Sequence, residues 1–69
     1  MIGGTTILFC SNLKNLRIKY NMSQESLAVL LHVSRQAISR WENGITEPDI
    51  NTLKRISAFF HITVDTLIS

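Results

Sequence analysis

The chain has 69 residues, with seven Lys or Arg against five Asp or Glu, so its formal net charge is +2. A chain this short buries only about 60% of the surface that its unfolded form exposes, which excludes a second domain and a large catalytic architecture. Hydrophobic residues make up 45% of the sequence, which excludes a disordered chain. So small and apolar a domain is a candidate for pairing with a second subunit.

Signals for redox chemistry, metal binding and export are weak. Cys10 is the single cysteine and cannot close a disulfide within the chain, and His32 and His61 lie far from it in sequence. We therefore expect no metal site and no cofactor. The first eleven residues carry no Lys or Arg, and their apolar run is too short for a signal-peptide core or a membrane span. These features predict a cytoplasmic protein that is not anchored to a membrane.

In chain order, residues 1–11 are predicted to be an N-terminal arm or extension before a domain over residues 12–69. Thr5–Phe9 is the only strand-like run. It is compatible with an ordered arm, with a strand that pairs between subunits, or with an extension without structure. The helical period starts after Ser11, which can cap a first helix over about residues 12–20.

Two further helices are predicted in the middle of the chain. Ser23 can cap a helix over residues 24–31, and Ser34 can cap a helix that starts at residue 35 and stops at the Asn43-Gly44 pair. Between them His32 can adopt a positive φ, which gives a tight turn.

The last two predicted helices follow Gly44 and Pro48, which interrupt the helical pattern. Asp49 is predicted to cap the start of the fourth helix, His61 to end it, and Thr63 to cap the start of the fifth. The side chains of these two helices that are predicted to point inward are Ile50, Leu53, Ile56, Ser57, Phe60, Val64, Leu67 and Ile68.

The predicted third helix separates an apolar side from a polar, basic side. The polar side carries Arg35, Gln36, Ser39 and Arg40. Two helices joined by a three- to four-residue turn, with such a face on the second, suit the DNA major groove. Arginine can bond guanine and glutamine can bond adenine, so the first two of these residues have the chemistry to read adjacent bases. Residues 12–44 hold five basic and two acidic side chains, which also suits a polyanion.

The order and spacing of two segments carry a family resemblance. Residues 23–28 (SQESLA) and 33–44 (VSRQAISRWENG), followed by Pro48 and Leu53, resemble the Cro and phage-repressor helix-turn-helix family, also called Xre-type. The resemblance covers about residues 12–69, with the motif at about residues 24–43. It implies an all-α, five-helix, lambda-repressor-like DNA-binding domain, in agreement with the five predicted helices.

The resemblance also implies roles for individual residues. The base-facing positions are Arg35, Gln36, Ser39 and Arg40, and a buried structural ion pair joins Arg17 to Glu42. Gln24 is similar to a glutamine that contacts a phosphate and braces the third helix. The full set expected at phosphates is Ser23, Gln24, Ser34, Asn43, Thr46, Lys14 and Lys19, with Ser23 and Ser34 at helix N-termini. His32 stands where the family often has Gly or Asn, and Glu47 makes the following loop less basic than in some relatives.

Other conspicuous side chains have structural interpretations. Trp41 shares the apolar side of its helix with Ile38 and is predicted to lie in the core. Phe59 is predicted either to be exposed or to pack against a second subunit. Cys10 is interpreted as a small buried apolar residue, and the Lys54-Arg55 pair as a solvated helix face.

These features predict a sequence-specific, double-stranded-DNA-binding transcriptional regulator of the nucleoid, acting as a repressor. It is expected to bind its operator as a homodimer formed through the C-terminal helices, around Phe59, Val64, Leu67 and Ile68. No small-molecule effector is evident. The alternative is a protein-interaction module of the same fold, antitoxin-like or partner-docking. An enzyme is not expected, because no nucleophile, base and orienting group can be assembled.

Overall fold

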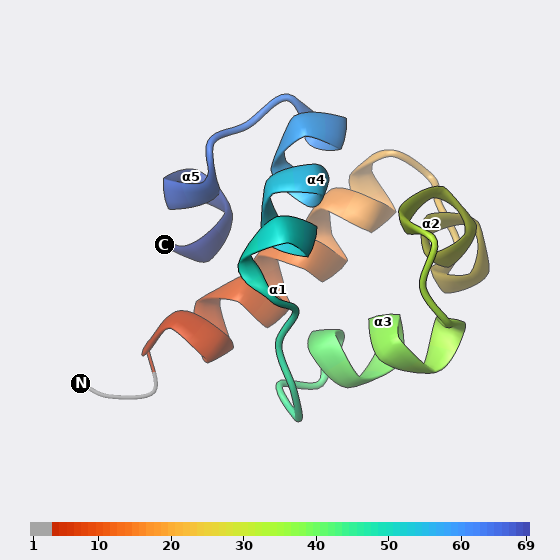
Figure 1. The fold of residues 1–69 in the computed structure, drawn as a ribbon, viewed down its shortest axis with the longest axis horizontal. Coiled ribbons are helices and arrows are strands. Elements are labelled where there is room, and N and C mark those ends of the chain that lie inside the picture. Colours follow the sequence, from red (N-terminus) through yellow and green to blue (C-terminus); the bar gives the residue numbers. More distant parts are fainter. Residues whose placement is uncertain (1–3) are drawn as a thin grey trace.

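The computed structural model describes residues 4–69, and within this range it contains five α-helices and no strand (Figure 1). In Figure 1, α1 passes through the middle, α2 and α3 lie on one side, α5 lies on the other, and α4 crosses in front. The neighbouring pairs are α1 with α3 and α5, α2 with α3 and α4, and α4 with α5. The all-α, five-helix prediction is therefore confirmed. The helix bounds are α1 Gly4–Lys19, α2 Gln24–Leu31, α3 Arg35–Glu42, α4 Ile50–Phe60 and α5 Val64–Ile68.

Side-chain caps start the last four helices where the sequence predicts them. In each case the cap oxygen accepts a hydrogen bond from the backbone amide three residues further on, over 2.9–3.1 Å. Such a bond satisfies one of the amides that a helix leaves without a partner in its first turn. The four caps are Ser23, Ser34, Asp49 and Thr63.

Two histidines end α2 and α4 in the same way. His32 and His61 both have φ 59° and ψ 42°, the left-handed conformation that closes a helix. The residue after each, Val33 or Ile62, packs against the core and donates its amide to a carbonyl five residues earlier, over 3.0 Å. The predicted role of both histidines as helix caps is confirmed. Gly44, two residues after the end of α3, also has a positive φ, of 72°.

The start of α1 differs from the prediction. The helix begins at Gly4, so Ser11 lies inside it and does not cap it, and the strand-like interpretation of Thr5–Phe9 is wrong. Thr, Ile and Phe have modest helix propensity, and for that reason the local pattern favours a strand. Phe9 nevertheless continues the buried stripe of Leu13 one helical turn earlier and is only 1% exposed. Burial therefore overrides local propensity; residues 1–3 of the expected arm lie outside the described part.

Every helix contributes to one hydrophobic core. Trp41 is 7% exposed, so its predicted place in the core is confirmed. Ile50 does not point inward as predicted: it is 56% exposed, and α4 joins the core only from Leu53 onward. The buried hydrophobic residues are Phe9, Leu13, Leu27, Ala28, Leu31, Ile38, Trp41, Ile56, Phe60 and Leu67.

The cap of α4 leads to a prediction about pH. The hydrogen bond from the Thr52 amide holds the pKa of Asp49 below its ordinary value of 3.8. Because the folded pKa is the lower one, this stabilisation is complete above pH 3.8 and is lost as the pH falls through the lowered value. Asp49→Asn keeps a capping oxygen that does not titrate. In urea unfolding between about pH 5 and pH 2, the free energy of unfolding of the variant is expected to rise relative to that of the parent chain as the pH falls. A constant difference would contradict the assignment.

Candidate nucleic-acid interface

The helices α2 and α3 form one unit joined by the His32 turn. Val33 anchors the turn in the core, and the side of α2 formed by Leu27 and Leu31 is buried together with Ile38 of α3. The last buried side chain of α2 and the first helical residue of α3 are only four positions apart. The orientation of α3 therefore depends directly on how α2 is held.

The outer face of α3 is polar and exposed. Arg35, Gln36 and Arg40 are exposed, and no described residue forms a hydrogen bond or ion pair with their side chains. Gln36, Arg40 and Asn43 follow one another at intervals of four and three residues and so share one face of the helix. Ser39 differs from the other predicted base-facing residues, because it is half-buried and its hydroxyl accepts a hydrogen bond from Asn43 Nδ2 over 3.4 Å.

Behind this face, a buried polar network joins α3 to α1 and α2. The Arg17 guanidinium donates to both carboxylate oxygens of Glu42, over 2.6 and 3.1 Å, so the predicted ion pair is present. Arg17 also donates to the Met22 carbonyl over 2.8 Å, and Gln24 Nε2 donates to Glu42 over 3.0 Å. The side chains of Arg17 and Glu42 are 14% and 3% exposed. The network thus connects the end of α3 with the start of α2.

The network also affects the titration of Arg17 and the free donors of Gln24. The hydrogen bond to Glu42, assisted by the attraction of its charge and opposed by burial, raises the pKa of Arg17. The shift favours the cationic form of Arg17, the form that pairs with Glu42. Gln24 uses one amide hydrogen on Glu42, which leaves the second hydrogen of the same nitrogen for another acceptor. A phosphate oxygen is an acceptor of this kind.

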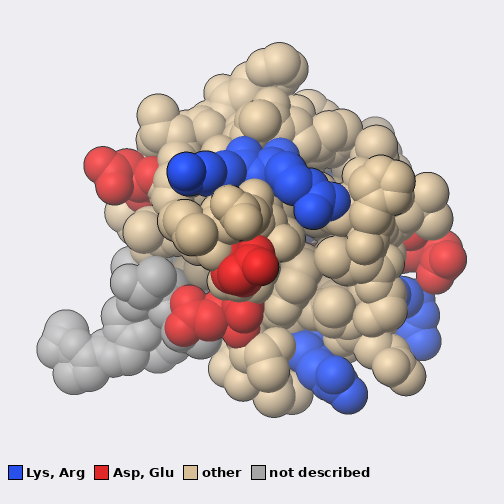
Figure 2. All heavy atoms as spheres, viewed as in Figure 1, with Lys and Arg blue, Asp and Glu red and all other residues tan. Residues whose placement is uncertain are grey.

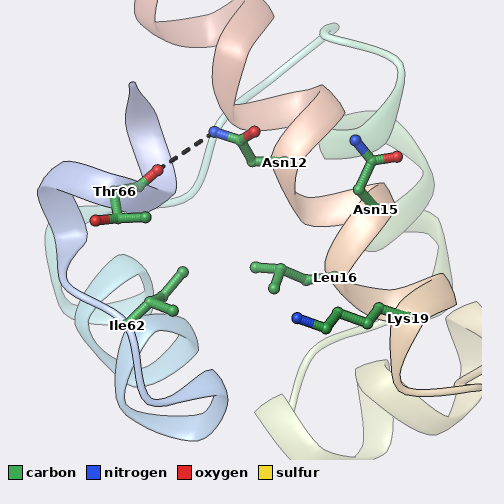
Figure 3. A pocket seen from close by; sticks show the side chains of 6 residues that line it. All are labelled: Asn12, Asn15, Leu16, Lys19, Ile62 and Thr66. Atoms are coloured by element: carbon green, nitrogen blue, oxygen red, sulfur yellow. Dashed lines mark hydrogen bonds between the residues drawn. The ribbon is translucent and has the colours of Figure 1, made fainter.

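The remaining predicted phosphate-contacting residues are spread over the surface. Ser23 and Ser34 are exposed at the starts of α2 and α3, and Thr46 is exposed in the loop after α3. Lys14 is exposed on α1. Lys19 is exposed at the end of α1, where it borders a cavity of about 210 Å³ that α1 forms with α5 and the turn before it (Figure 3). The other residues that line the cavity are Asn12, Asn15, Leu16, Ile62 and Thr66.

Two side chains have roles that sequence reasoning missed. Arg55 of α4 is exposed, as predicted for a solvated helix face, and in addition it donates from Nη2 to the Leu31 carbonyl at the end of α2. Asn12 of α1 donates from Nδ2 to the Leu67 carbonyl over 2.8 Å, at the end of α5. Both bonds satisfy carbonyls that a helix leaves free in its last turn. Neither has a sequence signal, because the partners are 24 and 55 residues apart.

Charge is distributed unevenly over the surface. Figure 2 shows basic side chains at the lower right, over α3, and a second basic group above the centre, over α4, with acidic side chains near the centre, over the loop that leads into α4. The basic residues of α3 are Arg35 and Arg40, and the acidic residues of that loop are Glu47 and Asp49. A polyanion is therefore attracted to α3 and repelled from the start of α4.

A helix-turn-helix family model matches residues 13–67, which include all of α2 through α4. The chain belongs to this Cro-like helix-turn-helix family. Over 61 residues it is 49% identical to the HTH-type transcriptional activator BcrR of Enterococcus faecalis, a match that covers 88% of this chain and 30% of BcrR. The chain spans between 30% and 56% of the length of four curated relatives that it matches.

Solved structures confirm the fold. The SOS-response transcriptional repressor LexA of Eubacterium rectale superimposes with a TM-score of 0.88 at 26% identity, covering 94% of this chain and 69% of that one. Hydroxypropylphosphonic acid epoxidase of S. wedmorenis matches with a TM-score of 0.87 at 26% identity, covering 99% of this chain and 36% of the epoxidase. The same fold thus occurs in a regulator and within an enzyme.

No helix within residues 4–69 is both long and apolar enough to span a membrane. Over the same range, no three His, Cys, Asp or Glu side chains gather in a way that could hold a metal ion.

Proposed function

We propose that the chain is a sequence-specific, double-stranded-DNA-binding repressor that reads the major groove with α3. The observation that carries this proposal is the outer face of α3. There the side chains of Arg35, Gln36 and Arg40 are exposed and form no hydrogen bond or ion pair with a described residue. Exposed arginine and glutamine on a helix that can enter the groove are the side chains that bond guanine and adenine edges. Occupation of the operator is sufficient for repression.

Backbone contacts are proposed to orient α3 in the groove. Gln24 is the best-placed phosphate ligand, because Glu42 holds its amide nitrogen while one hydrogen stays available. The amides at the starts of α2 and α3 add donors for phosphate oxygens. Asn43 uses one hydrogen of its amide nitrogen on Ser39, which leaves the second hydrogen for a phosphate oxygen. The residues proposed for weaker phosphate contacts are Thr46, Lys14 and Lys19.

A homodimer is proposed to place two copies of α3 about 34 Å apart, one helical turn of DNA, on a two-fold operator. The predicted contact set needs one correction, because Leu67 is fully buried in the core and is not a surface residue. Phe59 is 37% exposed and stacks edge-on against Phe60, so it offers apolar surface to a partner. Val64 and Ile68 are partly buried and complete the proposed contact.

The second candidate is a protein-interaction module of the same fold. The similarity to part of an epoxidase supports this candidate, because it shows that the same fold also occurs within a protein that is not named a regulator. A module of this kind does not require free arginine and glutamine side chains on α3. The two candidates therefore differ in what they predict for Gln36.

Selection of duplexes from a random DNA pool, with the parent chain and Gln36→Ala in parallel, tests the proposal. The parent chain is expected to enrich a palindrome. Gln36→Ala is expected to lose preference at one base pair of each half-site and about 1–3 kcal/mol of binding free energy on the preferred site.

The control is Lys14→Ala, a proposed phosphate contact outside the polar network, which is expected to weaken binding to all sequences alike, because phosphate contacts carry no base information. Equal losses on every sequence for both variants would contradict the assignment of Gln36 to a base. A folded parent chain that enriches no duplex would favour the protein-interaction module.

A further inference from the structure

A side-chain hydrogen bond that the proposed function does not use joins α4 to the end of α2. Arg55 donates from its guanidinium to the carbonyl of Leu31, the last residue of α2. Leu31 directly precedes His32, whose φ of 59° redirects the chain toward α3. The helix-turn-helix corner is defined here as the end of α2 at Leu31, the His32 turn and the start of α3 at Arg35. A side chain of α4, which is not part of this corner, is therefore bonded to it.

The α2 terminus has a specific need for this donor. The turn satisfies two of the last carbonyls of α2 with its own amides, since His32 donates to Val29 and Val33 donates to Ala28. Neither amide reaches the carbonyl of Leu31. A cation near a helix C-terminus also offsets the negative end of the helix dipole, and α2 has no basic residue in its last turn. Arg55 supplies both the missing donor and the missing charge.

The corner is thus held at two points. At the start of α2, Gln24 is bonded to Glu42 of α3 over 3.0 Å. At the end of α2, Leu31 is bonded to Arg55. The first point joins α2 to α3, and the second joins α2 to α4. The second bond therefore restricts how α2, and with it α3, is oriented relative to the rest of the domain.

We propose that Arg55 is a positioning residue for DNA recognition, which holds α2 so that phosphate contacts from α2 and base contacts from α3 fit the same duplex. The inference rests on the proposed function. Arg55 itself touches no base. Losing its bond is expected to reduce binding to the operator, where both sets of contacts must form together, more than binding to random DNA, where phosphate contacts suffice.

The test compares Arg55→Gln with Lys54→Gln on the selected operator and on a random duplex. Both variants remove one positive charge from adjacent positions of α4, and Lys54 is exposed with no side-chain hydrogen bond or ion pair to a described residue. Arg55→Gln is expected to bind the operator roughly tenfold more weakly than Lys54→Gln, with equal binding to random DNA. Arg55→Lys, which keeps the charge but not the planar fork, is expected to lie between the parent chain and Arg55→Gln.

Amide hydrogen exchange at His32 and Val33 provides a readout without DNA, and faster exchange is expected in Arg55→Gln but not in Lys54→Gln. Equal binding of the two variants to both duplexes would overturn the proposal. So would a folded Arg55→Gln that melts at a lower temperature but binds the operator as tightly as Lys54→Gln does. If Arg55→Gln does not fold, Arg55→Lys must show the loss of operator preference or the proposal fails. A parent chain without any preferred duplex would remove the proposed function itself, and this inference with it.

Discussion

Replacing Glu42 by alanine is expected to lower the free energy of unfolding by up to roughly 3–5 kcal/mol, because it removes a buried carboxylate and leaves the half-buried Arg17 guanidinium without its counter-ion. Glu42 accepts two hydrogen bonds from Arg17 and one from Gln24, so a single substitution removes three bonds. Arg17 keeps only its bond to the Met22 carbonyl. A domain of this size has a total stability of roughly 3–10 kcal/mol, so most or all of it is expected to be lost.

Chemical unfolding followed by circular dichroism measures this loss. Glu25→Ala is the matched control, because Glu25 is an exposed glutamate in the first turn of α2, where removing the charge costs at most about 1 kcal/mol. Similar losses for the two variants would show that the network contributes little. The double variant Arg17→Met with Glu42→Leu removes both charges together and is expected to recover much of the stability, as buried pairs replaced by apolar residues often do.

The second large effect is expected at Trp41. Trp41→Ala is expected to cost about 3–5 kcal/mol, because the removed indole leaves a cavity that the surrounding side chains fill only in part. Trp41 is 7% exposed and belongs to the same core as Leu13 of α1 and Ile56 of α4. The loss is therefore expected to unfold the whole domain and not α3 alone.

Trp41 is the only tryptophan, so far-ultraviolet circular dichroism and not fluorescence must follow the unfolding of the alanine variant. Trp41→Phe keeps most of the apolar volume and is expected to retain a cooperative transition at a lower midpoint. If Trp41→Ala melted like the parent chain and lost only DNA binding, the indole would be a base-stacking group and its assignment to the core would be wrong.

The ends of α2 through α5 could be predicted from the sequence because the signals are local. A serine, threonine or aspartate cap bonds an amide three residues away, and a left-handed histidine needs only its own backbone and the residue that follows. The polar face of α3 was predictable for the same reason, since its period lies within eight residues. These features set the helix-turn-helix unit and the residues that it exposes.

Contacts between distant residues decided the rest. The helical conformation of α1 at Phe9 is favoured by the burial of that side chain in the core, against the local preference of its neighbours for a strand. The local pattern predicts that Ser39 faces a base and that Ile50 points into the core. In the folded chain Ser39 is half-buried and Ile50 is exposed.

The sequence by itself therefore determined the family, the helix caps and the exposed chemistry of α3, because each depends on residues within a few positions of one another. Only the tertiary structure decided how the helix-turn-helix corner is held. Arg55 meets Leu31 across 24 residues and Asn12 meets Leu67 across 55, and no local period encodes either contact. Such pairs form only when the packed core brings their helices together, so their roles follow from the fold and not from the residue pattern.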